Sequence, residues 1–138
     1  MVSDAIQVAG FIWRGTVVWD KTQGVRPYKG RFRHQAEYVL WGSKGPLPKP
    51  AKDAPVVPGV LQCSPQRGER LHQVHKPEEV MKQLIRIVPP GGNILDPFAG
   101  SGTTLIEAAR AGHQATGIEL SEHYHQVAAD RIKKENRR

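Results

Sequence analysis

The sequence predicts an α/β protein in which parallel strands are combined with an antiparallel hairpin. From Pro77 onward, amphipathic and short apolar segments follow the order helix–strand–helix–strand–helix. That order is typical of parallel strands joined by right-handed crossovers. Before Gly42, two segments rich in aromatic and β-branched residues are separated by a long loop, which favours an antiparallel pair.

The N-terminal elements follow from local composition. Residues 3–9 are predicted to form a short helix. The segments FIWRGTVVW (11–19) and AEYVLWG (36–42) predict two strands. Between them lies a glycine-containing basic loop, residues 20–33. We therefore expect residues 1–45 to form a hairpin segment.

A proline-rich stretch follows the hairpin, with five prolines between Gly45 and Gly59. Each proline lacks a backbone N–H and restricts the residue before it. Residues 46–70 are therefore predicted to be an irregular linker, and residues 71–138 a second segment with the helix–strand pattern.

Within the second segment, Pro77 suits the first position of a helix that ends at Pro89–Gly92. Its apolar residues share one face: Val80, Leu84, Ile87 and Val88. Strands are predicted at 93–96 and 114–120, and a helix at 103–111. Ser121 is expected to cap a last helix whose buried side carries Tyr124, Val127, Ala128 and Ile132.

Composition limits the classes of function. The net charge is +7, and residues 21–52 carry eight Lys or Arg residues against one acid, Glu37. Such a patch favours a phosphate-bearing partner such as nucleic acid, although a solvated basic surface is the simpler alternative. The single cysteine, Cys63, excludes an internal disulfide, and the simplest interpretation is a reducing cytoplasm. The histidines show no metal-ligand spacing.

The stretch DPFAGSGTT (96–104) links a predicted strand to a predicted helix. Gly100 and Gly102 let a ligand approach the backbone, and free N–H groups open the helix. Glu119 ends the next strand 19 residues after Gly100, at the place where this architecture binds ribose hydroxyls. The pattern predicts a nucleoside ligand.

Three nucleoside ligands compete for this loop. A P-loop requires a lysine that the loop lacks, and a dinucleotide site requires a third glycine where Leu105 stands. S-adenosylmethionine (SAM) needs no phosphate cradle and remains. Asp96 suits the methionine ammonium, or else caps the following helix. Glu119 could equally be a solvated acid at a strand end.

These residues together resemble the amino-group DNA methyltransferases, the adenine-N6 and cytosine-N4 enzymes of bacteria and phages, many from restriction–modification systems. DPFAGSGTT resembles their cofactor motif, GIEL (117–120) their second cofactor motif, and HKPEEVMKQLI (75–85) the helix that precedes the glycine loop in the permuted, β-type order. The resemblance implies a partial Rossmann-like, doubly wound sheet. It implies SAM-binding residues in the segment 71–138: Lys76, Asp96, Pro97, Phe98, Gly100, Ser101, Gly102, Thr103 and Glu119.

The resemblance also implies transfer of a methyl group from SAM to an amino group of adenine or cytosine in double-stranded DNA, after base flipping. The family holds the base with an Asp/Asn/Ser-Pro-Pro-aromatic motif, which this sequence lacks. Its only Pro-Pro pair, Pro89–Pro90, follows Val88. We therefore name no catalytic residue and expect the chain alone to be inactive, as the cofactor-binding C-terminal part of such an enzyme.

The missing motif implies missing central strands. We expect a homodimer or a second polypeptide to supply them, and the alternative is an inactive remnant or subunit that binds DNA or a methyltransferase partner. In either case the basic loop would contact DNA phosphates through four residues: Arg26, Lys29, Arg31 and Arg33.

Overall fold

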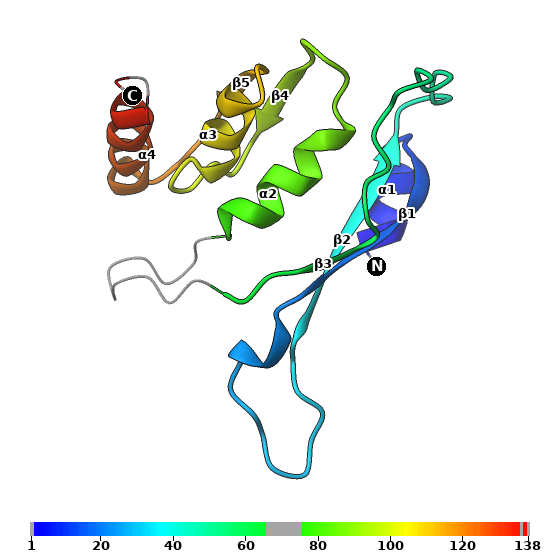
Figure 1. Ribbon diagram of the computed structural model, residues 1–138, viewed down its shortest axis with the longest axis vertical. Helices are drawn as coiled ribbons and strands as arrows, with labels where there is room; N and C mark the ends of the chain where they lie inside the picture. Colours follow the sequence, from blue (N-terminus) through cyan, green and yellow to red (C-terminus); the bar gives the residue numbers. More distant parts are fainter. Residues whose placement is uncertain (1, 66–75, 136, 138) are drawn as a thin grey trace. The chain divides into compact units, whose positions relative to one another are not determined.

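The computed structural model describes residues 2–65, 76–135 and 137. It divides into two compact units, Met1–Ser64 and Pro65–Arg138, and each is described here by itself (Figure 1). Residues 66–70 of the expected linker and 71–75 of the next segment lie outside the described residues. In the part of the chain that is described, no helix is long and apolar enough to cross a membrane.

The first unit is a three-stranded sheet with the strand order β2-β1-β3. Strand β1 pairs antiparallel with β2, as the sequence predicts, and parallel with β3. Its elements are α1 (Val2–Val8), β1 (Ile12–Asp20), the 3-10 turn η1 (Thr22–Gly24), β2 (Ala36–Ser43) and β3 (Val60–Gln62).

The prediction of no regular structure in residues 46–70 is wrong at β3, where Leu61 lies opposite Trp19. The physical reason is that the run of prolines ends at Pro58, so that residues 60–62 keep backbone N–H groups able to join a ladder. Within the strand, Leu61 packs into the core and is only 5% exposed.

The core of the first unit is centred on Trp19, which is 5% exposed. Its indole Nε1–H donates a hydrogen bond to the carbonyl oxygen of Cys63 at 2.8 Å. Trp19 therefore holds the segment after β3 against β1 through both apolar burial and a directed hydrogen bond.

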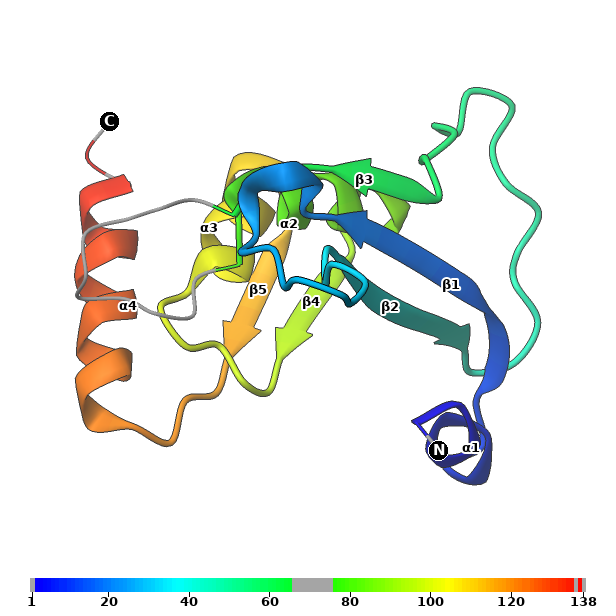
Figure 2. The same ribbon diagram turned by 90° about the horizontal axis from the view of Figure 1, so that it is seen from below.

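The second unit pairs β4 (Asn93–Asp96) with β5 (Gln114–Gly117) in parallel, which confirms the parallel arrangement expected for this segment. Helix α3 (Thr103–Arg110) packs on both strands and lies between α2 (Glu78–Leu84) and α4 (Glu122–Glu135) (Figures 1 and 2). A 3-10 turn, η2 (Ile85–Ile87), extends α2.

Two expectations about these elements are wrong. Strand β5 stops at Gly117 rather than 120, because Ile118 turns to pair with the loop: its N–H donates to Asp96 O and its carbonyl accepts from Ala99 N–H. The second expectation concerns the buried face of the helix after Pro77, which was predicted to include Ile87. The helix tightens to 3-10 geometry at Ile85, so that Ile85 is buried and Ile87 is 56% exposed.

Helix α4 buries a narrower face than its sequence pattern predicts. Ala128 is buried, Val127 and Ile132 are half-buried, and Tyr124 is 37% exposed. The first turn of the helix therefore does not pack as the periodicity suggested, and Tyr124 lines a cavity instead.

The structure predicts unequal roles for two tryptophans of β1. Replacing Trp19 with Ala should lower the free energy of unfolding of the first unit by about 3–5 kcal/mol, because a large buried side chain is lost. Replacing Trp13, which is 48% exposed on the same strand, should change it by about 1 kcal/mol or less. Urea unfolding followed by fluorescence measures both, since all three tryptophans lie in this unit; equal losses would contradict the core described here.

Candidate functional site

The carboxyl ends of β4 and β5 border a cavity of about 500 Å³, a volume typical of small-molecule sites. The structure brings together there most of the residues that the sequence indicated. These are Lys76, Asp96, Phe98, Gly100, Ser101, Thr103 and Glu119.

Two predicted residues take other places. Pro97 is exposed in the turn and is not among the residues that line the cavity. Gly102 is buried at the N-cap of α3, where a Cβ would lie 3.1 Å from the Cβ of Ala128 on α4. Its left-handed backbone, with φ of 79°, and this close approach both require glycine.

Sequence reasoning missed four lining residues: Met81, Ala99, Thr104 and Tyr124. Ala99 and Thr104 lie inside DPFAGSGTT, so the motif itself contained the signal. Met81 follows Pro77 by one helical turn, which places it over the start of α2. Tyr124 has the spacing of a residue on the buried face of the last helix, and this spacing gave no sign that it would line a cavity.

Glu119 joins the two loops at the mouth of the strands. Its Oε2 accepts a hydrogen bond from the N–H of Gly100 at 2.8 Å, and its Oε1 accepts one from the N–H of Ser121 at 2.8 Å. These hydrogen bonds, the one from Ser121 foremost, lower the pKa of the Glu119 carboxyl below its ordinary value of 4.5. Glu119 thus accepts hydrogen bonds from both loops, which a purely solvated acid at a strand end would not do.

Gly100 adopts a backbone conformation that favours glycine, although there is space for a side chain at this position. Its φ of 53° lies in the left-handed region, while nothing stands within 4 Å of the place where a Cβ would be. The positive φ aims its N–H at Glu119 and shapes the turn that borders the cavity.

Asp96 forms a turn within the loop rather than capping the next helix. Its Oδ1 accepts a hydrogen bond from the N–H of Phe98 at 3.0 Å, whereas the N-cap of α3 is Gly102. Phe98 itself is 88% exposed. Among the described residues, no group of three or more His, Cys, Asp or Glu side chains is placed to hold a metal ion.

The basic loop belongs to the first unit and is closed at its base, where Lys21 N–H donates to the carbonyl oxygen of Gln35 at 2.7 Å. Asp20 stiffens this base, since its Oδ1 accepts from the N–H of Thr22 and from the amide of Gln35. The side chains of Arg26, Lys29 and Arg31 are exposed.

Arg33 has a different environment from the other three basic residues. Its Nη1 donates to the carbonyl oxygens of Gln23 at 2.9 Å and Val25 at 3.4 Å, so that it braces the loop from inside. Its neighbour Phe32 is 96% exposed. The loop thus presents an aromatic ring among cations.

The lowered pKa of Glu119 predicts a pH response. Because the pKa is lower in the folded protein, the stability that this carboxylate contributes is fully present above pH 4.5 and is lost as the pH falls through the folded-state pKa. The amide resonances of Gly100 and Ser121 should therefore shift together with a midpoint below 4.5, and the shift should be absent in Glu119→Gln. A midpoint at or above 4.5 would contradict the geometry.

Comparison with known proteins agrees with this fold. Residues 1–130 match the model of the DNA methylase family N6_N4_Mtase. The chain is 36% identical over 90% of its length to the inferred methylase YubD of Escherichia coli strain K12. It is 30% identical over 98% of its length to the type II methyltransferase M2.DpnII of Streptococcus pneumoniae.

Among solved structures, the M1.HpyAVI–SAM complex matches 95% of this chain with a TM-score of 0.80 and 26% identity. The match covers 67% of that structure, and this chain spans 52% of YubD and 56% of M2.DpnII. With the family match extending over nearly the whole length of a Rossmann-like fold, the chain belongs to the N6/N4 DNA methylase family.

Proposed function

We propose that this chain binds SAM in the cavity beside Glu119, as part of a protein that transfers the methyl group to an exocyclic amino group of adenine or cytosine in double-stranded DNA. The observation that carries the proposal is the carboxylate of Glu119, which the N–H groups of Gly100 and Ser121 hold in one orientation at the strand ends.

The residues present fit SAM on chemical grounds. An ionised carboxylate has about four lone-pair sites. Backbone hydrogen bonds from Gly100, Ser121 and Leu120 use part of this capacity, and the remainder suits the hydroxyls of a ribose. Bound SAM supplies an activated methyl group, and the protein's part is to hold it in line with the acceptor nitrogen.

Lys76, Met81 and Tyr124 complete the wall of the cavity. Lys76 brings a cation to the start of α2, whereas Met81 and Tyr124 add an apolar and an aromatic surface. This mixture of a few polar groups with apolar walls is typical of a site for a nucleoside that carries an amino-acid group.

Holding the target base requires residues beyond those in this sequence, which has no Asp/Asn/Ser-Pro-Pro-aromatic motif. We assign that role to another polypeptide segment or to a second, different chain. The second candidate function, an inactive subunit that binds DNA, rests on the same missing motif.

The basic loop is the proposed contact with DNA. Arg26, Lys29 and Arg31 are exposed and suit phosphate contacts, whereas Arg33 supports the loop through Gln23 and Val25. We place the protein in a bacterial cytoplasm, encoded by a bacterium or a phage, because its DNA substrate is there.

Cofactor binding is tested by calorimetry with SAM. The chain should show saturable binding, and Glu119→Gln should weaken it by about 10–100-fold, because the amide places an NH2 group against a backbone N–H and loses charged hydrogen bonds. Glu122→Gln, an exposed acid three residues further on, is the matched control and should bind as tightly as the unmodified chain. Absence of saturable binding by the unmodified chain would exclude the proposed function.

DNA binding is tested by replacing Arg26, Lys29 and Arg31 together with Ala. Affinity for duplex DNA should fall, and the slope of log K against log salt should become shallower by about 0.9 for each phosphate that the variant no longer neutralises. Removing Lys133 and Lys134, exposed cations on α4, serves as a control for general charge. Equal reductions in affinity for the two variants would show that the loop has no special role.

A further inference from the structure

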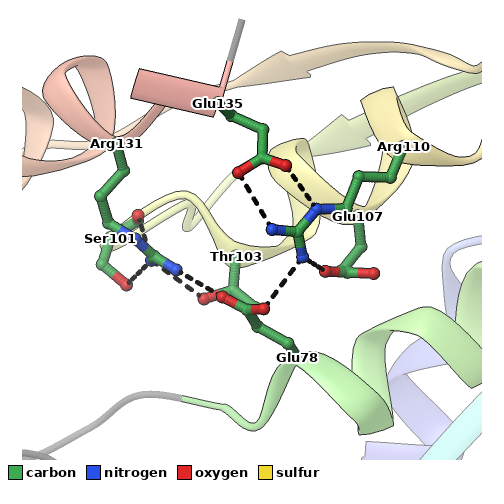
Figure 3. Close-up of polar contacts among 7 residues, drawn as sticks. All are labelled: Glu78, Ser101, Thr103, Glu107, Arg110, Arg131 and Glu135. Carbon is green, nitrogen blue, oxygen red and sulfur yellow. Dashed lines mark hydrogen bonds and ion pairs between the residues drawn. The ribbon is translucent and has the colours of Figure 1, made fainter. Parts of the chain in front are cut away.

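Arg131 on α4 extends onto the glycine loop of the second unit (Figure 3). Its Nη1 donates to the carbonyl oxygen of Ser101 at 2.7 Å, to Ser101 Oγ at 3.1 Å and to Thr103 Oγ1 at 3.3 Å. Both Ser101 and Thr103 line the cavity. A residue 30 positions away in the sequence thus contacts the loop from behind.

Glu78 at the start of α2 fixes the other end of this guanidinium. Its Oε1 accepts from Arg131 Nη2 at 3.1 Å, and its Oε2 accepts from Arg110 Nη1 at 2.9 Å. Arg110 also pairs with Glu135, at 2.8 and 3.0 Å, and with the buried Glu107. This acid–arginine cluster of Glu78, Glu107, Arg110, Arg131 and Glu135 ties α2, α3 and α4 together (Figure 3).

The direction of the hydrogen bonds between Arg131 and the two hydroxyl groups follows from the chemistry of the guanidinium. A guanidinium only donates hydrogen bonds, so Ser101 Oγ and Thr103 Oγ1 must accept from Arg131. A hydroxyl that accepts in this way keeps its own proton for another acceptor. The Thr103 proton has no acceptor among the described residues.

We propose that Arg131 is a positioning residue, which presents the loop hydroxyl of Thr103 as a hydrogen-bond donor to the amino-acid carboxylate of the bound cofactor. The inference rests on the proposed SAM site. The new element is that recognition of the amino-acid part of the ligand depends on Arg131 of α4, a side chain that does not itself line the cavity.

The alternative is that Arg131 only stabilises the fold. Arg110 provides the matched comparison, because it belongs to the same cluster and bonds to Glu78 but makes no hydrogen bond to the loop in the described structure. A purely structural role would give Arg131→Gln and Arg110→Gln the same effect on ligand binding.

The test is calorimetry with two probes, S-adenosylhomocysteine, which has the amino-acid part, and 5′-methylthioadenosine, which lacks it. Arg131→Gln should weaken binding of S-adenosylhomocysteine by about 10-fold, the loss of one charge-assisted hydrogen-bond network, and change binding of methylthioadenosine by less than about 2-fold. Arg131→Lys should recover part of the loss. Arg110→Gln should leave the ratio of the two affinities unchanged.

Thr103→Val keeps the shape of the side chain, removes only the hydroxyl, and keeps the test decisive if Arg131→Gln folds poorly. It should weaken S-adenosylhomocysteine binding selectively. Equal weakening of both probes by Arg131→Gln, no weakening, or the same ratio change in Arg110→Gln would overturn the inference while leaving the proposed function intact. Failure of the unmodified chain to bind either probe would overturn both.

Discussion

The second unit depends on the ionised carboxylate of Glu119. It accepts hydrogen bonds from Gly100, at the loop after β4, and from Ser121, at the entry to α4. Without that charge, two backbone donors at neighbouring strand ends would have only a weaker, neutral acceptor. The ladder between β4 and β5 brings these ends together, because Asp96 and Gly117 are partners in register. The acid then fixes how the chain leaves both strands.

Around this centre, charged side chains also hold the helices together. The acid–arginine cluster places Glu107, only 4% exposed, beside Arg110, whose pKa is raised chiefly by hydrogen bonds to Glu135 and Glu78. Arg110 is therefore always cationic and keeps the buried acid compensated. The basic loop of the first unit follows the same principle on a smaller scale, because Asp20 and Arg33 satisfy backbone groups at its base.

Elements defined by residues close in sequence could be predicted, whereas elements that depend on contacts with distant residues could not. The glycine loop, Glu119 and the strand at 93–96 follow from residues close in sequence, and the structure brings them together. Strand β3 escaped prediction because it is stabilised by pairing with the distant Trp19, and because the prolines before it indicate an irregular backbone. Arg131 escaped because a cation on a helix normally indicates a solvated face, whereas its partner Glu78 lies 53 positions earlier. Arg33 was indistinguishable from its exposed neighbours for the same reason.

The close approach of Gly102 to Ala128 places the end of the cofactor loop within van der Waals contact of α4, one helical turn before Arg131. Gly102 therefore leaves no room for a side chain between the loop and the helix, and any larger residue there would push the two apart. The glycine that ends this loop thus also sets how closely the last helix of the unit can pack.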